Sequence, residues 1–341
     1  MEAQSISNAV DLPLRERLRD SAPARLASRY PQYTATAVIA LGILILIARH
    51  GLHEVAQVSL NGLVLGSVYA LGAVGLTLVY GILKLTNFAH GDFLTFGAYM
   101  AFLVNVTWGG PLVLAIVFGM LATALMAVFL EKIMWGPMRA RRAGLLQLLL
   151  MSIGLAFLLR YTIQFIWGTK VRALDVNVTD SVEFLGLRMG QTELIVVVIG
   201  VITLSAVGLM LKYTLLGKRM RALSDNFDLA ETSGIDTSQV VLFTWIFAGA
   251  LAGLAGVLAS EVSNLRPEFG FALLLPIFAA VILGGIGDAF GALAGGIVLG
   301  LVTELSTLEI EPRWKVAVGF AVLIIVLFVR PQGIFGKATS I

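Results

Sequence analysis

The chain has 341 residues, of which 58% are hydrophobic and only 13% charged, and its formal net charge is +3. This composition predicts that a lipid bilayer surrounds most of the chain. The absence of cysteine excludes thiol catalysis, disulfide bonds and thiolate metal sites. With only three histidines we expect no metal site, and because the basic residues cluster beside apolar segments we expect no nucleic-acid partner.

The N-terminal region differs from the rest of the chain. Residues 1–33 are polar and rich in arginine, and they predict a cytoplasmic tail or a short helix on the membrane surface. The apolar segment 34–48 is as short as a signal-peptide core, but Arg49 and His50 follow it in place of a small-residue cleavage site. We therefore predict an extra first span and an outer loop over residues 34–56.

Apolar stretches recur along the chain at lengths near the roughly 20 residues that cross a bilayer as a helix. They predict an all-α polytopic membrane protein with about ten transmembrane helices, two or three of them short. The expected spans are 34–48, 58–82, 93–106, 111–130, 145–167, 194–211, 240–259, 271–283, 290–305 and 316–329. The main transmembrane domain is expected to cover residues 57–337.

Lysine and arginine collect in four clusters, and such clusters mark cytoplasmic loops. They precede the first span, follow the fourth and the sixth, and end the chain, so ten spans place all four on one side. Both termini are then predicted to be cytoplasmic, and so is the polar segment 217–238. The mixed-charge segment 168–192 is expected to be an outer loop.

The polar segment reads GKRMRALSDNFDLAETSGIDTS and interrupts two apolar stretches. Ser224 can cap a short helix in which Phe227, Ala230 and Glu231 lie on neighbouring turns, and Gly234 can end it in the left-handed conformation. One interpretation is an amphipathic helix that an external partner drives. The other is an ordinary solvated loop.

Two Gly-Asp steps, Gly91-Asp92 and Gly287-Asp288, each precede a Gly-Ala pair and a short apolar segment. The glycine allows a sharp entry and the aspartate can cap the helix that follows. Gly-interrupted segments at matching places in two halves indicate the central pathway of a transporter. A second internal similarity, between GLVLG at 62–66 and GIVLG at 296–300, suggests internal duplication.

Polar and glycine residues at these steps are candidates for the translocation path or its gate, because polar groups within hydrocarbon are costly unless they are paired or hydrated. The candidates are Asn61, Asn87, His90, Gly91, Asp92, Gly284, Gly285, Gly287 and Asp288. The simpler alternative is that Asn87, His90 and Asp92 only cap a helix, with His90 bonded to the backbone.

Several functions can be weighed from motifs. The chain has no Gly-x-x-x-x-Gly-Lys-Ser/Thr phosphate loop, so any ATP must be hydrolysed by another chain. It also lacks a ladder of carboxylates within its spans, which favours a channel or an ABC permease over a secondary transporter. The sequence GIGD at 285–288 fits the signature of intramembrane aspartyl proteases, but the second aspartate that such chemistry needs could only be Asp92, which lacks the usual Tyr-Asp context. The protease therefore stays a remote alternative.

The run LNGLVLGSVYAL at 60–71, followed by GLTLVYG at 75–81 and NFAHGD at 87–92, resembles the membrane subunits of branched-chain amino acid ABC importers. The similarity continues in LGGIG at 283–287 and RPQGIFG at 330–336. It covers roughly residues 57–337 and fits best the first of the two permease subunits that such importers pair. The N-terminal extension departs from the usual pattern.

The resemblance implies an ABC importer permease fold in a bacterial inner membrane. Its partners would be a second, paralogous permease in a heterodimer, two ATP-binding subunits that carry ATP and Mg, a periplasmic substrate-binding protein and membrane lipid; the chain itself would hold no cofactor. The resemblance also places an ATPase-coupling loop at 217–238, with Asp225, Phe227, Asp228, Leu229, Ala230, Glu231, Gly234 and Ile235 as its contact residues.

The substrate expected from the resemblance is a branched-chain or other neutral hydrophobic amino acid. An apolar path with few fixed charges suits such solutes better than ions. Related permeases that carry urea or short-chain amides have a similar segment around Asn87 to Asp92, so these solutes remain the alternative.

Overall fold

The computed structural model describes residues 31–176, 181–184, 186–330 and 332–334. The predicted N-terminal tail therefore lies almost entirely outside the described residues, as does part of the C-terminal RPQGIFG motif. The chain divides into two compact units, Met1–Val55 and Ala56–Ile341. The first contains α3 (Pro31–His50), whose last turn carries Arg49 and His50, and the beginning of α4 (Leu52–Leu83).

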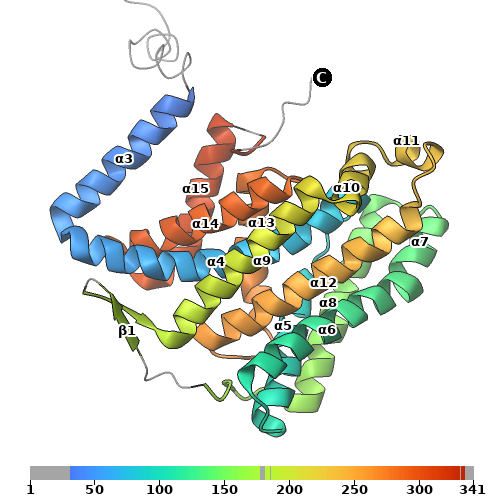
Figure 1. Cartoon of the computed structure of the whole chain (residues 1–341), viewed down its shortest axis with the longest axis horizontal. Coiled ribbons are helices and arrows are strands. Elements are labelled where there is room, and N and C mark those ends of the chain that lie inside the picture. Colours follow the sequence, from blue (N-terminus) through green and yellow to red (C-terminus); the bar gives the residue numbers. More distant parts are fainter. Residues whose placement is uncertain (1–30, 177–180, 185, 331, 335–341) are drawn as a thin grey trace, which may run out of the picture. The chain divides into compact units, whose positions relative to one another are not determined.

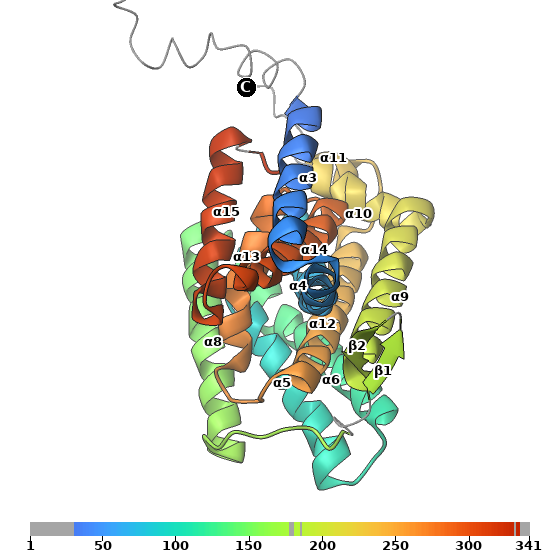
Figure 2. The same ribbon diagram turned by 90° about the vertical axis from the view of Figure 1, so that its left-hand side faces the viewer.

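The second unit is helical almost throughout (Figures 1 and 2). After α4 its α-helices are α5 (His90–Phe102), α6 (Leu112–Leu130), α7 (Gly136–Ala140), α8 (Leu145–Trp167), α9 (Gln191–Tyr213), α10 (Leu215–Asp225), α11 (Phe227–Thr232), α12 (Thr237–Val262), α13 (Phe269–Gly284), α14 (Ala289–Leu305) and α15 (Lys315–Val329). Short π turns follow α5 and α6, at Leu103–Thr107 and Glu131–Trp135, and 3₁₀ turns at Ser306–Leu308 and Pro312–Trp314 precede α15.

The polytopic helical architecture is confirmed, but the number of spans is not. Among the described residues, six helices are long and apolar enough to cross a membrane: Leu52–Leu83, Leu112–Ala140, Leu145–Trp167, Gln191–Tyr213, Thr237–Val262 and Ala289–Leu308. The other predicted spans also lie in helices, but α5 has 13 residues, α13 has 16 and α15 has 15. At 1.5 Å per residue a 13-residue helix extends about 20 Å, which is less than the hydrocarbon thickness of about 30 Å.

One small sheet departs from the all-α prediction. Within the segment 168–192, strands β1 (Ser181–Phe184) and β2 (Leu187–Gly190) form an antiparallel hairpin in which Ser181 pairs with Gly190. Gly186, at φ 81°, makes the turn between them, a conformation that glycine adopts without steric cost.

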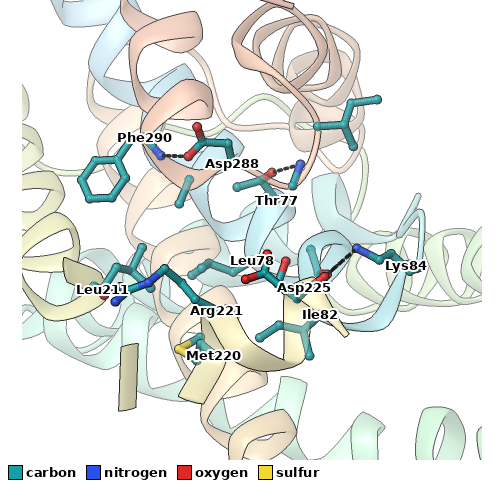
Figure 3. Close-up of a pocket in the computed structure, with 15 residues that line it drawn as sticks. Thr77, Leu78, Ile82, Lys84, Leu211, Met220, Arg221, Asp225, Asp288 and Phe290 are labelled. Carbon is teal, nitrogen blue, oxygen red and sulfur yellow. Dashed lines mark hydrogen bonds between the residues drawn. The ribbon is translucent and has the colours of Figure 1, made fainter. Parts of the chain in front are cut away.

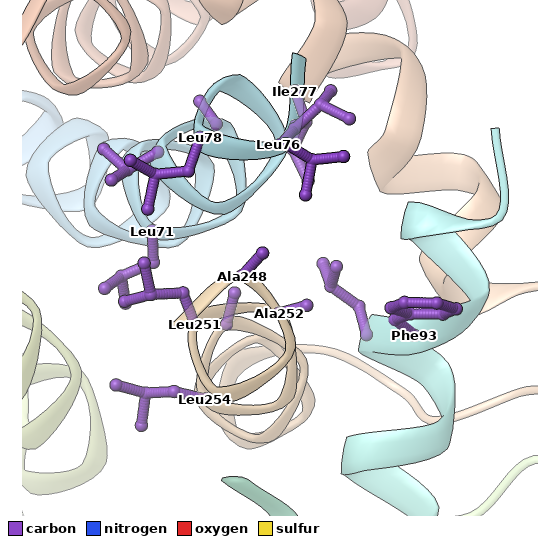
Figure 4. Close-up of a cluster of buried hydrophobic side chains, with 14 of the residues drawn as sticks. Leu71, Leu76, Leu78, Phe93, Ala248, Leu251, Ala252, Leu254 and Ile277 are labelled. Carbon is purple, nitrogen blue, oxygen red and sulfur yellow. The ribbon is translucent and has the colours of Figure 1, made fainter. Parts of the chain in front are cut away.

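The core of the second unit is built around α4 and α12, most of whose side chains are buried. Leu71 of α4 and Leu251 of α12 belong to one buried cluster, which also includes Phe93 of α5 (Figure 4). Small residues allow the helices to approach closely. A methyl group added at Gly253 of α12 would overlap the backbone of Gly119 in α6, and one added at Gly256 would overlap that of Leu94 in α5.

The two similar sequences, GLVLG at 62–66 in α4 and GIVLG at 296–300 in α14, pack against each other. A methyl group at Gly300 of α14 would overlap the backbone of Gly66 in α4, and one at Gly296 would overlap that of Ala70. The similarity of the two sequences therefore has a direct physical reason, because small residues four positions apart let two helices touch.

Candidate functional site

The polar segment folds as two short helices, α10 and α11, rather than the single helix predicted. Thr214 caps α10 by accepting a hydrogen bond from the Gly217 amide (3.1 Å), and Asn226 caps α11 by accepting one from the Leu229 amide (2.9 Å). The prediction that Ser224 is the cap is wrong, since it lies inside α10. Asn226 takes the capping role because its extended backbone breaks the helix.

The surface of α11 presents apolar and acidic side chains together. Leu229 is 63% exposed and Phe227 36%, and Asp228 and Glu231 are exposed beside them. Ala230 is buried and anchors the helix. The outer surface of this helix therefore combines two exposed apolar side chains with two acidic ones.

The chain turns from α11 into α12 at Gly234 to Asp236. Gly234 has φ 83°, which confirms the predicted left-handed position. Ile235 is half-buried and donates its amide to the Ala230 carbonyl (3.1 Å), which holds the turn against α11. Asp236 then caps α12 through the Gln239 amide (3.0 Å).

A pocket of about 340 Å³ lies beside α10, and we call it the α10 pocket (Figure 3). Four parts of the chain line it: the end of α4, the end of α9, α10, and the turn between α13 and α14 with the first residues of α14. Its lining residues include Thr77, Leu78, Gly81, Ile82 and Lys84 from α4 and the residue after it, Leu211 from α9, Met220, Arg221, Ser224 and Asp225 from α10, and Ile286 to Phe290. The pocket thus connects the polar segment with the second Gly-Asp step.

Lys84 joins two of these walls. Its backbone is in the left-handed region, at φ 52°, which is uncommon for a residue other than glycine. Its ammonium donates to the Gly81 carbonyl (2.8 Å) and to the Ser224 carbonyl of α10 (3.3 Å). Lys84 therefore ties the end of α4 to α10.

The second Gly-Asp step has the predicted form. Asp288 caps α14 by accepting a hydrogen bond from the Phe290 amide (3.0 Å). Gly285 and Gly287 have φ values of 115° and 89°, so the turn needs both glycines. The Gly287 amide donates to the Thr77 hydroxyl of α4 (3.0 Å), which fixes the turn against the wall of the α10 pocket.

The first Gly-Asp step is different. The α5 helix begins at His90, and Asp92 therefore lies inside its first turn. The prediction that Asp92 caps the helix is wrong. Gly91 packs against the backbone of Gly270, and the next residue, Asp92, reaches α8. There its carboxylate accepts two hydrogen bonds from Arg160, at 3.0 and 3.1 Å.

The Asp92–Arg160 pair is buried: the Asp92 side chain is fully buried and that of Arg160 is 14% exposed. The guanidinium also lies 4.3 Å from the ring centre of Phe271 in α13. Such pairing is how an ionic group is accommodated within an apolar bundle. Sequence reasoning missed Arg160, although an arginine inside the apolar stretch 145–167 was itself a signal.

His90 and Asn87, which precede Asp92 in the chain, contact the backbone through their side chains. His90 Nε2 lies 2.9 Å from the Gly72 carbonyl, as the simpler interpretation predicted, and the Asn87 side chain accepts a hydrogen bond from the Ala89 amide (3.1 Å). The nearby Phe88 amide donates to Ser152, in the first half of α8 (3.2 Å). The start of α5 therefore lies beside the second to third turn of α8.

The structure does not gather all the path candidates in one place. Gly91 packs against Gly270 at the start of α13, whereas Gly284 is the last residue of that helix, about 20 Å along it. Asn61 is exposed elsewhere on α4. Two separate positions result: the ion pair at α5 and α8, and the turn beside the α10 pocket.

Comparison with known proteins assigns the family. Residues 58–327 match the model of the branched-chain amino acid transport system / permease component family. The chain belongs to this family. Relatives include the high-affinity branched-chain amino acid transport system permease protein LivH of Escherichia coli, 31% identical over 295 residues that cover 82% of this chain and 95% of that protein. LivH of Salmonella typhimurium is 30% identical over 300 residues, with the same coverage. The corresponding protein BraD of Pseudomonas aeruginosa is 28% identical over 300 residues, which cover 84% of this chain and 97% of BraD.

The chain is accordingly a membrane permease subunit and not an enzyme. The aspartates that the protease alternative would need have other partners in the structure, because Asp288 caps α14 and Asp92 pairs with Arg160. Among the described residues, no group of three or more histidine and acidic side chains could hold a metal ion.

Proposed function

We propose that this permease is one membrane subunit of an ATP-driven importer that carries branched-chain or other neutral hydrophobic amino acids into the cytoplasm. The observation that carries the proposal is the match to LivH and BraD over nearly their whole length. The names of these relatives state branched-chain amino acid transport. The partners in the proposal are a paralogous permease, two ATP-binding subunits that hold ATP and Mg, and a periplasmic binding protein.

In this proposal the segment 217–238 docks on an ATP-binding subunit. The exposed Phe227 and Leu229 would enter an apolar groove, as a helix does in helix-in-groove recognition, and the acids Asp225, Asp228 and Glu231 would face basic groups at its rim. The Lys84 bond to Ser224 would carry motion of α10 to α4.

The proposed topology has ten spans in a bacterial inner membrane, with both termini cytoplasmic. It is supported by the four basic clusters, which ten spans place on one side. The helices α5, α13 and α15 would be its short or interrupted spans. The turn at Gly284 to Asp288 would gate the cytoplasmic end of the path, and Asp92 with Arg160 would lie deeper along it.

Two measurements test the proposal. Calorimetry of the cognate binding protein with leucine, other neutral amino acids and urea should give binding of neutral amino acids; binding of urea or a short amide alone would move the assignment to that alternative. For docking, Glu231→Arg and Gly234→Pro should abolish uptake while the protein stays in the membrane. Uptake retained by both variants would refute the docking segment.

A further inference from the structure

The α10 pocket has a chemical character that docking does not explain. Its lining includes two basic residues, Lys84 and Arg221, and two acidic residues, Asp225 and Asp288. Among the described residues these acids form no ion pair with these bases, because the Lys84 ammonium donates to carbonyls and Arg221 donates to the Leu211 carbonyl. Opposite charges that line one pocket without pairing can receive a ligand that carries both.

The acids retain acceptor capacity. Within the described part of the chain Asp225 accepts no hydrogen bond, and Asp288 uses one carboxylate oxygen for the Phe290 amide and leaves the other unused. The Arg221 guanidinium has five N–H donors, and it uses one of them for the hydrogen bond to the Leu211 carbonyl. A carboxylate on the ligand can therefore pair with Arg221, and an ammonium group with Asp225.

Apolar side chains in the wall can accommodate a small aliphatic side chain, beside the hydroxyl residues Thr77 and Ser224. Leu78, Met220 and Phe290 contribute to it, and Figure 3 shows them around the charged groups. A volume of about 340 Å³ lies near the lower end of the range of small-molecule sites, about 300–1,000 Å³. The dimensions fit a single amino acid better than a nucleotide or a peptide.

We propose that the α10 pocket is a second amino-acid site, open to the cytoplasm, where a zwitterionic amino acid with an aliphatic side chain binds and slows transport. This inference rests on the proposed function, because it takes the segment 217–238 as the cytoplasmic coupling element. A ligand held between α10, α4 and the Gly287-Asp288 turn opposes relative motion of these elements. Accumulated product would then reduce its own import.

The experiment uses the complete importer, with its partner permease, ATP-binding subunits and binding protein, in vesicles that contain ATP. Initial uptake of labelled leucine is measured while unlabelled leucine inside the vesicles is raised into the millimolar range. Uptake by the native complex should fall severalfold. Internal 4-methylpentanoate, which lacks the ammonium group, and 3-methylbutylamine, which lacks the carboxylate, should not inhibit.

The variants are Arg221→Gln and Asp225→Asn, with Lys132→Gln as the matched control at an exposed position outside both the pocket lining and the segment 217–238. Loss of one charge-assisted contact should weaken inhibition by about tenfold or more in Arg221→Gln and Asp225→Asn, and the control should respond like the native complex. Because either pocket variant could impair coupling, equilibrium binding of labelled leucine to the purified permease complex, without binding protein or ATP, is measured as well.

The outcomes separate this inference from the proposed function. Leucine binding that is lost in Arg221→Gln and kept in Lys132→Gln supports the site, even if the former variant does not transport. Native uptake unaffected by internal leucine, or binding that both pocket variants retain, overturns the inference and leaves the importer assignment intact. If the native complex takes up no neutral amino acid at all, the proposed function fails instead.

Discussion

The buried Asp92–Arg160 pair makes a quantitative prediction. Asp92→Asn leaves the guanidinium without a counter-charge, and Arg160→Met leaves the carboxylate alone in a site where it is fully buried. Removal of one partner of a buried ion pair costs about 3–5 kcal/mol, whereas replacement of both by uncharged groups is often close to neutral. Each single variant should therefore be destabilised by about this amount, and the double variant should recover most of the loss.

The assay is unfolding of the purified permease in mixed detergent micelles, followed by circular dichroism, for the native chain, the two single variants and the double variant. The control is the exposed pair Glu183–Arg188, whose side chains are 54% and 76% exposed. Such surface pairs contribute about 0–1 kcal/mol, so Glu183→Gln should change stability little. Single variants as stable as the native chain, or a double variant no more stable than the singles, would contradict this prediction.

Three further predictions concern other parts of the fold. Gly300→Leu should strongly destabilise the permease, because the new side chain forces α14 away from α4. Gly154→Leu on α8 should be tolerated, because a Cβ atom there meets nothing within 4 Å. Thermal unfolding in detergent compares the two variants. Glu231→Arg should reduce the ATPase activity that loaded binding protein stimulates in the complete importer, with membrane levels unchanged by immunoblot. The Ser238 hydroxyl, which donates to Asp236, lowers the pKa of that carboxyl, so its capping contribution should be present above the ordinary aspartate pKa of about 3.9 and lost as the pH falls below it. Asp236→Asn should keep the cap and lose this pH dependence in melting curves between acidic and neutral pH; an unchanged dependence would contradict the assignment.

Features set by local backbone chemistry could be predicted from the sequence. Gly234 and Asp288 behave as predicted because a left-handed helix end and an N-cap depend on the residue itself and its immediate neighbours. The helices also follow, since about 20 apolar residues in a bilayer must satisfy their backbone groups internally. The family resemblance gave the permease assignment.

Features that depend on distant contacts could not be predicted. Asp92 meets a partner 68 positions later in the chain, on α8, so its local pattern indicated a cap and missed the pair. The failed prediction for Ser224 is local instead: Thr214 begins a helix that already contains Ser224, and Asn226, two residues later, caps the next one. The α10 pocket brings together α4, α10 and the α13–α14 turn, which no single stretch of sequence describes.

Uptake by the reconstituted importer tests the proposed function most directly. Vesicles containing this permease, its paralogous partner and the ATP-binding subunits are given loaded binding protein outside and ATP inside, and labelled leucine is followed over time. An ATP-driven importer should accumulate leucine only when ATP, the binding protein and this chain are all present. Leucine entry that continues without ATP, or complete absence of uptake for every neutral amino acid that the binding protein holds, would contradict it.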